Sequence, residues 1–351
     1  MAGPGDSSVE GWGSYLAVGR ETTYGTQVTS TAFLEFLSSS LKATKERKII
    51  EEIVVGRSYT KEVGLSRTIE GELECYAYCE SLAFNYLLQN ALGGAITTAT
   101  GTGETVGGLS FEHTVPIGNL GGSYSSISIN TRKGQATSGR VFEYFGLKVN
   151  EVGFNAEIDE ALKCTFGLTG KDVTATSNDI SANYSATSSE PLSFVNGRVS
   201  IQAGLLASIT TATVWHVQNF ELKIANNLKA DAASRRIGTD TLDVLPLGVA
   251  GVDFKVTMRF NTTTAYLAMM AGTEYSAELE FQGSTLTTSK LTRLIKFQIP
   301  RLTIAEAGDP EVSGPDEILT SEVTFNVLKD VSSASGYALR AIVRNLTSSY
   351  T

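Results

Sequence analysis

Residues 68–78 alternate between two kinds of side chain, and this pattern limits the possible folds more than any other stretch of the chain. One set is apolar or small: Ile69, Gly71, Leu73, Cys75 and Ala77. The other set is acidic or aromatic: Glu70, Glu72, Glu74, Tyr76 and Tyr78. A period of two residues is typical of a β-strand that is buried on one face only. The stretch therefore predicts a sheet with an apolar face against a core and a polar face toward water.

A short amphipathic helix is predicted directly after this strand, over residues 80–92. Its large apolar side chains recur at intervals of three to four residues: Leu82, Phe84, Leu87, Leu88 and Leu92. Gly93 and Gly94 follow and are expected to end the helix. We expect this helix to cover one end or one face of the sheet.

The composition agrees with a mainly β fold. Hydrophobic residues make up 42% of the 351 residues, glycine is abundant at 34 and proline scarce at 7, and Thr, Ser and Val fill the extended segments. The length favours two domains. A net charge of −9 disfavours a protein that holds nucleic acid by its phosphates. It is compatible with a surface past which nucleic acid slides without being held.

Several functional classes find no support in the sequence. Cys75, Cys79 and Cys164 lack metal-ligand spacing, which predicts reduced thiols, and the two histidines are too few for most histidine metal sites. No apolar run is long enough to span a bilayer, and no signal peptide opens the chain. A hydrolytic or carbohydrate-active enzyme would need convergent carboxylates or a nucleophile with its base. We therefore expect no catalytic residues, no metal and no cofactor.

The three carboxylates on one face of the predicted strand, Glu70, Glu72 and Glu74, admit three interpretations. They could form a Ca²⁺ or active-site cluster, a solvated sheet face, or the acidic wall of a channel. The first is disfavoured because no His, Asp or glycine turn accompanies them.

The same order of elements returns later in the chain, between about residues 217 and 272. The strand at 69–78 corresponds to 252–261, and the helix corresponds to 263–271, with Gly272 after it. Further matches keep the same order: 40–44 with 227–231, 145–152 with 297–304, and 165–172 with 324–330. The preserved order indicates one long duplication. A chain with two similar surfaces in tandem pairs naturally with copies of itself in a closed ring, which also removes open sheet edges.

These observations divide the chain into five parts. We expect a loose N-terminus (1–14), a first module (15–172), a linker with a possible hairpin across Asn196-Gly197 (173–213), a second module (214–330) and a C-terminal segment (331–351). The Gly- and Thr-rich stretch at 94–122 is expected to be a flexible surface loop without a counterpart in the second half.

Taken together, these features resemble the tail tube proteins, or major tail proteins, of long-tailed bacteriophages, in particular the family with a duplicated tube domain. The resemblance rests on Gly19-Arg-Glu-Thr-Thr-Tyr-Gly-Thr26, on the block 34–93, on its return at 217–272 and on the matched closing strands. It implies two tandem β-sandwich or barrel domains, each with a short flanking helix. It also implies that the inner strands join those of neighbouring chains in one ring-wide β-barrel.

The resemblance further implies the function and the partners. The chain would be a structural subunit of the tail tube, with rings of three chains and pseudo-sixfold symmetry that stack helically into a conduit for genome delivery. Its partners would be copies of itself, the tape-measure protein, the tail terminator and distal-tail proteins, and genomic DNA that passes without specific binding; no membrane is implied. It would be located in the virion tail, after assembly in the host cytoplasm. The alternatives are a distal-tail or baseplate ring protein of the same fold and another self-assembling β filament subunit, such as one from a pilus or surface layer.

Two surfaces carry the expected assembly contacts. An arm between two inner strands, residues 43–67 with a second-half partner at 230–250, would reach the adjacent ring; a solvated surface hairpin is the alternative. Its expected stacking residues carry charges of both signs: Lys45, Arg47, Lys48, Glu51, Glu52, Arg57, Lys61, Glu62, Arg235 and Arg236. Mixed charges on one protrusion can pair with the opposite pattern on a neighbour and set the register of a stack. Glu70, Glu72 and Glu74 would line the lumen and repel DNA phosphates.

Overall fold

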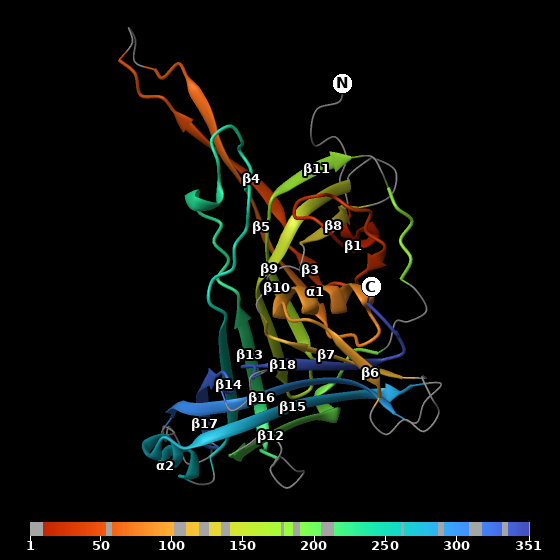
Figure 1. Ribbon diagram of the computed structural model, residues 1–351, viewed down its shortest axis with the longest axis vertical. Coiled ribbons are helices and arrows are strands. Elements are labelled where there is room, and N and C mark those ends of the chain that lie inside the picture. Colours follow the sequence, from red (N-terminus) through yellow and green to blue (C-terminus); the bar gives the residue numbers. More distant parts are fainter. Residues whose placement is uncertain are drawn as a thin grey trace.

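The computed structural model describes residues 10–53, 58–101, 110–118, 126–134, 141–176, 179–184, 190–204, 214–260, 263–286, 291–308, 318–331 and 336–350. Most of this is antiparallel β-strand, with two α-helices in the described part of the chain. The expected mainly β class is confirmed (Figure 1). Neither of these helices is long and apolar enough to cross a membrane.

A central sheet runs through both halves of the chain in the order β4–β5–β10–β9–β13–β14–β17–β16, with β3 also beside β5. Its strands are β3 (Ser38–Ser39), β4 (Lys42–Ile49), β5 (Glu62–Tyr76), β9 (Val141–Glu157), β10 (Lys163–Gly170), β13 (Val217–Ala225), β14 (Gly251–Arg259), β16 (Thr292–Ala307) and β17 (Thr320–Leu328). The sheet does not close on itself. Among the described residues, β3 and β4 pair only with β5, and the last residues of β16 pair only with β17.

Two further groups of strands pack over the central sheet. The first is β2 (Ala32–Phe33), β1 (Tyr15–Arg20), β8 (Ile127–Arg132), the start of β9, and β11 (Asp172–Thr176). The second is β12 (Gly197–Ala203), β15 (Glu274–Thr285), the start of β16, β18 (Arg340–Asn345), β7 (Phe111–Pro116) and β6 (Thr97–Thr100). The long strands β9 and β16 belong to both layers because each is long enough to bend from one layer into the other, and each pairs through an irregular register.

The apolar faces of these layers form one core shared by the two halves of the chain. Phe154 on β9 lies 4.6 Å from Phe297 on β16, measured between ring centroids, and both side chains are fully buried. Helix α1 (Leu82–Leu92) covers part of this core, with Phe84 against Phe166 of β10. The helix begins after Ser81, whose hydroxyl accepts from the Phe84 N–H, and ends at Gly93 with a φ of 68°. The predicted helix at 80–92 is therefore confirmed, with Ser81 as its N-cap.

The stretch 94–122 is not simply a surface loop. Its described residues form the strands β6 and β7, and β7 pairs with β18 from the end of the chain. Glu112 of β7 accepts a 2.5 Å hydrogen bond from Arg344 of β18. Residues of the expected C-terminal segment thus tie the first half of the chain to the second.

The expected linker at 173–213 contains the strands β11 and β12. In place of a hairpin across Asn196-Gly197, residues Phe194–Asn196 form a 3-10 turn (η2), and β12 then pairs with β15. The returning helix is α2 (Thr264–Ala271), which ends at Gly272 with a φ of 63°.

Candidate assembly surfaces

One face of the central sheet is polar along its whole width. Glu70, Glu72 and Glu74 lie on this face of β5, because the residues between them are Gly71, which faces the core side, and the fully buried Leu73. Across the sheet the same alternation continues: Leu73 pairs with Phe166, and Leu222 pairs with Phe154 and Phe254 on the core side. The face that the sequence pattern predicted is therefore continuous across both halves.

This polar face is concave and mainly acidic. Part of it forms a hollow of about 750 Å³ over β5, β10, β9 and β13. Its carboxylates are Glu70, Glu72, Glu74, Glu151, Glu157, Glu221, Asp253 and Glu322. Its cations are Lys42, Lys163, Lys223, Lys255 and Arg259. Three of these cations pair with carboxylates of the same face, the closest being Lys223 with Glu151 at 2.8 Å. The remaining surplus of carboxylates gives the face a negative potential.

The charged arm is a two-stranded ribbon that projects from the central sheet. β4 and the first residues of β5 form it, and Figure 1 shows it extending beyond the rest of the molecule at the upper left. All the side chains of β4 are exposed. Because the described residues leave β4 exposed beyond the base of the arm, the arm is available to a neighbouring molecule.

Several of the arm's charged side chains form ion pairs, some within the arm and one with a later segment. Arg47 donates to Glu62 at 2.5 Å, Lys61 donates to Glu52 at 2.5 Å, and Lys45 contacts Asp240 at 2.8 Å. Arg57 lies outside the described residues. Exposed pairs such as these contribute only about 0–1 kcal/mol each, but they leave fewer free charges than the sequence suggested. The expectation of stacking through these charges remains a prediction.

Five exposed apolar side chains on the arm were not recognised from the sequence: Ile49, Ile53, Tyr59, Val63 and Leu65. The signal was present, because Val63 and Leu65 continue the two-residue spacing of Ile69 in the sequence. In the structure, the pairing of β4 with β5 shifts register between Lys45 and Arg47, so that Val63 lies opposite Lys48. The charged residues between the apolar ones indicated ionic contacts instead.

The second-half segment expected as a matching arm, residues 230–250, supports the first arm. The Arg67 N–H of β5 donates to the Asp240 carbonyl at 2.7 Å. Arg235, just after the 3-10 turn Ala232–Ser234 (η5), donates to the Arg67 carbonyl at 3.0 Å. Arg236 lies outside this contact and pairs with Asp243 at 3.3 Å. Arg235 thus holds the base of the first arm, whereas Arg236 remains exposed.

The guanidinium of Arg67 connects three segments at this base. It pairs with Asp172 at the start of β11 and with Asp240. The hydrogen bond to Asp172 raises the pKa of Arg67, and the hydrogen bond from Lys45 lowers the pKa of Asp240. Arg67 and Asp240 are therefore charged at neutral pH.

The N-terminal motif Gly19–Thr26 has a structural role. Glu21 follows β1, and its buried carboxylate accepts from the Ser128 hydroxyl and the Gly146 N–H, both at 2.8 Å, and from the Gly25 N–H at 2.9 Å. Ser126 also donates to it. One carboxylate thus fixes the turn after β1 to β8 and β9.

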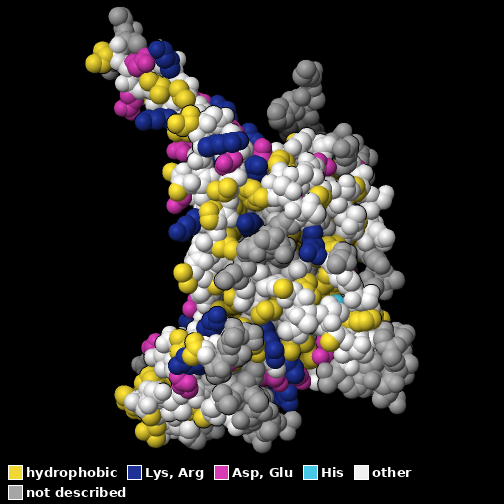
Figure 2. All heavy atoms as spheres, in the orientation of Figure 1, with side chains coloured by type: hydrophobic (Ala, Val, Ile, Leu, Met, Phe, Trp, Pro, Cys, Tyr) yellow, Lys and Arg dark blue, Asp and Glu magenta, His cyan; other side chains and the backbone are white. Residues whose placement is uncertain are grey.

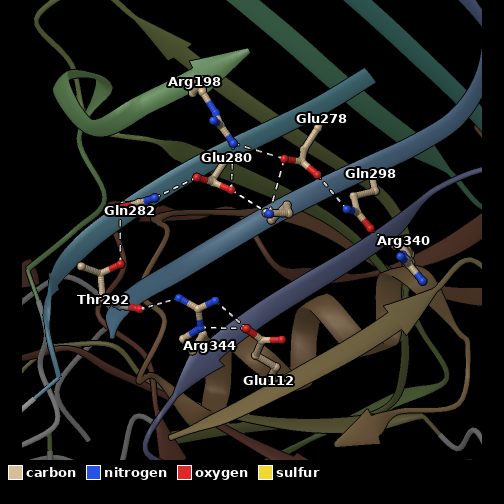
Figure 3. A network of polar contacts seen from close by, with 10 residues as sticks. Glu112, Arg198, Glu278, Glu280, Gln282, Thr292, Gln298, Arg340 and Arg344 are labelled. Atoms are coloured by element: carbon tan, nitrogen blue, oxygen red, sulfur yellow. Dashed lines mark hydrogen bonds and ion pairs between the residues drawn. The ribbon is translucent and has the colours of Figure 1, made fainter. Parts of the chain in front are cut away.

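A charged network around the buried Glu278 and Glu280 joins the second group of strands (Figure 3). Lys296 of β16 contacts Glu280 of β15 at 2.7 Å, and Arg198 of β12 contacts Glu278 and Glu280 at 3.3 Å. Burial raises the pKa of Glu280, but the hydrogen bonds from Lys296 and Gln282 outweigh it, so that the pKa lies below the usual value. The network joins strands, and we found no group of His, Cys, Asp and Glu among the described residues that could hold a metal ion.

A mainly β chain with an open sheet, a concave polar face and a projecting arm has features that suit a self-assembling structural subunit. The chain belongs to the phage tail tube protein family, whose model matches residues 11–327. It is therefore a structural subunit of a phage tail tube and a component of the virion tail, and it associates with copies of itself.

Other comparisons add little. A crystal structure of Hcp protein matches with 13% identity and a TM-score of 0.25, over 44% of this chain and 94% of that chain. A similarity this low carries no structural conclusion. No curated protein matches the chain.

Proposed function

We propose that copies of this chain close into a ring by joining the two free edges of the central sheet, β3 of one copy with the end of β16 of the next. The junction between β9 and β13 carries this proposal, because it already joins two four-stranded runs in this manner inside one chain. The first run has the order β3/β4–β5–β10–β9 and the second has the order β13–β14–β17–β16. Further copies of the chain add further runs through the same kind of junction, and the sheet is extended until it closes into a ring.

The two runs agree in their cross-strand partners, which supports a duplicated tube domain. Phe166 lies between Leu73 and Val152 in the first run. Phe325 lies between Phe254 and Ile304 in the second. We therefore propose tube domains at 15–172 and 214–330, and a ring of three chains with pseudo-sixfold symmetry.

In such a ring the concave polar face lines the lumen. Glu70, Glu72 and Glu74 then face the genome together with the other carboxylates of that face. Like charges keep DNA phosphates away from the wall, so the genome passes without being bound. The chemistry of the wall is repulsion and not catalysis, and we assign no catalytic residue.

The arm then connects one ring to the next, and the rings stack helically into the conduit for genome delivery. A tube of this kind encloses a tape-measure protein and ends on terminator and distal-tail proteins, and we propose these as partners. We also propose that assembly takes place in the host cytoplasm.

Electron cryomicroscopy of the concentrated protein tests the proposal. We expect open-ended tubes whose rings contain three chains, with β3 beside β16 of the neighbouring chain. A ring of six chains, or a seam formed by other strands, would contradict it. Single rings that never stack would favour a distal-tail or baseplate subunit.

A further inference from the structure

The arm is better suited to apolar than to ionic association. Its ion pairs Arg47–Glu62 and Lys61–Glu52 are formed within the ribbon, so that a neighbour would have to break them to use these charges. By contrast, Ile53 is fully exposed and 63% of Tyr59 is exposed, so that the described residues leave both side chains accessible. Burying apolar side chains of this size stabilises a contact more than an exposed ion pair does. The partner of the arm should therefore present an apolar surface.

Helix α2 presents such a surface. Tyr266, Leu267 and Met270 are 43%, 60% and 65% exposed. The helix packs against β16 through its other side, where Ala265 and Ala268 are buried. Ile318 is also exposed, one residue before Leu319, whose carbonyl accepts from the Phe260 N–H just ahead of this helix. Four large apolar side chains are thus exposed at one end of the molecule.

The first-half helix shows that this exposure is not a property of the element itself. α1 and α2 each end at a glycine in the left-handed region, Gly93 and Gly272. Counting back from these glycines, the exposed residues of α2 occupy the places of Leu87, Leu88 and Ala91, each of which is at most 1% exposed. These places on α1 are covered because the helix also packs against β1, β2 and β7. The same places on α2 lack a cover from the described residues.

The arm and α2 lie at opposite ends of the molecule. Figure 1 shows the arm at one end of the longest axis and α2 at the other. Figure 2 shows hydrophobic side chains at both ends. When the longest axis of every copy runs along the stack in the same direction, the surface at one end of each copy meets the opposite end of the next. A contact between two different surfaces repeats without closing and produces an open filament.

We propose that the exposed side of α2, formed by Tyr266, Leu267 and Met270, receives the apolar side chains of the β4–β5 arm from a copy in the adjacent ring. The proposal rests on the stacked rings of the proposed function and adds the acceptor site and its chemistry. The occupant is a second copy of this chain, and its contact is apolar.

Cross-linking between two single-cysteine variants tests the contact directly. Tyr59→Cys and Leu267→Cys protein would be mixed under conditions in which microscopy shows tubes, and treated with a short bismaleimide. The native Cys75, Cys79 and Cys164 are buried, so the introduced thiols react first. Val195→Cys replaces Leu267→Cys in the control, because Val195 is similarly exposed at 71% but lies on η2. We expect a covalent dimer from Tyr59→Cys with Leu267→Cys and far less from the control mixture.

A second variant changes the acceptor chemistry. Leu267→Asp with Met270→Asp should raise the protein concentration needed for tubes at least about tenfold, since two apolar contacts are lost at every interface. Val195→Asp should leave this concentration unchanged. Circular dichroism should show that both variants are folded. Two results would overturn the acceptor site and leave the tube function intact. One is normal tube formation by the double variant, and the other is wild-type-like tubes in the cysteine mixture with no more cross-linked dimer than in the control. A wild-type chain that forms neither rings nor tubes would overturn the proposed function as well.

Discussion

Arg67 and Asp240 meet through both backbone and side chain. The Arg67 N–H donates to the Asp240 carbonyl at 2.7 Å, and the guanidinium lies 3.3 Å from the Asp240 carboxylate. The contact joins β5 to a segment that is far away in sequence, at the point where the arm leaves the central sheet. It therefore sets the direction in which the arm projects.

Arg67→Ala should loosen the arm without unfolding the protein. The guanidinium also pairs with Asp172, so its removal leaves two carboxylates without this cation. These groups are partly exposed, and the loss in unfolding free energy should be small, about 1 kcal/mol. Hydrogen exchange should become faster over residues 42–49 and 62–68, while exchange in α1 stays unchanged. Arg236→Ala is the control because Arg236 contacts only the exposed Asp243 among the described side chains. Equal exchange in both variants would show that Arg67 does not position the arm.

Phe297→Ala should destabilise both halves of the chain together. Phe297 is fully buried against Phe154 of the first half, and large-to-small changes of this kind cost about 3–5 kcal/mol. Because the core is shared, thermal unfolding should remain a single transition at a lower temperature. The matched control is Phe33→Ala, which removes a partly buried ring on β2 at the border of the first half. Two separate transitions in the Phe297→Ala variant would indicate that the halves unfold independently.

Much of this fold could be predicted from alternation. The polar face at 68–78 and both helices followed from local periodicity, which depends only on the side chains in the stretch itself. The alignment of the two halves with each other could not be obtained from this periodicity. The sequence matches placed Ile69 opposite Val252, but the partners of Phe166 and Phe325 place Leu73 opposite Phe254, a shift of two residues that keeps the same face. A shift by two preserves alternation, and so the pattern alone could not fix the register.

The sequence could not reveal the pairing of β7 with β18, because the partners are more than 200 residues apart and β7 lies in a Gly- and Thr-rich stretch. It also could not show which arm charges pair within the chain. Gly71 is a further case: a Cβ there would lie 2.5 Å from the Leu41 Cα, and so this strand glycine permits close approach of the segment between β3 and β4. These three features depend on contacts between segments that only the folded chain brings together.

His113 should make the stability of the C-terminal strand depend on pH. Burial lowers the pKa of His113 below its usual 6.5, although hydrogen bonds to Thr347 and Asn345 act in the opposite direction. The folded state therefore keeps the ring neutral where the unfolded state already binds a proton, so stability should decrease as the pH falls below about 6.5. The ring also packs against Tyr350, with centroids 3.9 Å apart and ring planes tilted by 30°.

Chemical denaturation between pH 7.5 and 5 measures this effect. The wild type should lose more stability over this range than His113→Gln, which keeps a polar side chain but cannot titrate. Glu280 acts only at lower pH, because its folded-state pKa lies below 4.5. Burial raises the pKa of Glu80, but Glu80 is present in both proteins and so does not distinguish them. Identical slopes in the two proteins above pH 5 would contradict the assignment to His113.

Neutralising the acidic face should make the lumen wall hold DNA. Glu70→Gln with Glu72→Gln removes two charges from exposed positions that face away from the core, so folding and tube formation should be unchanged. Assembled tubes of the variant should retain more double-stranded DNA at low salt, and the difference should disappear as salt screens the charges. Glu10→Gln with Glu190→Gln removes the same charge from other exposed positions. Equal retention by both variants would mean that Glu70 and Glu72 do not face the lumen.

Glu21→Ala should be the most damaging of these changes to the N-terminal part of the chain. The carboxylate accepts from the Gly25 and Gly146 N–H groups and from the Ser126 and Ser128 hydroxyls, and all four donors would lose this acceptor. A buried, charge-assisted cluster of this kind should contribute about 3–5 kcal/mol to stability. Glu21→Gln keeps the shape and one acceptor oxygen, and so it should retain part of this free energy. Urea denaturation compares the three proteins, and a Glu21→Ala variant as stable as the wild type would show that the turn after β1 does not depend on this carboxylate.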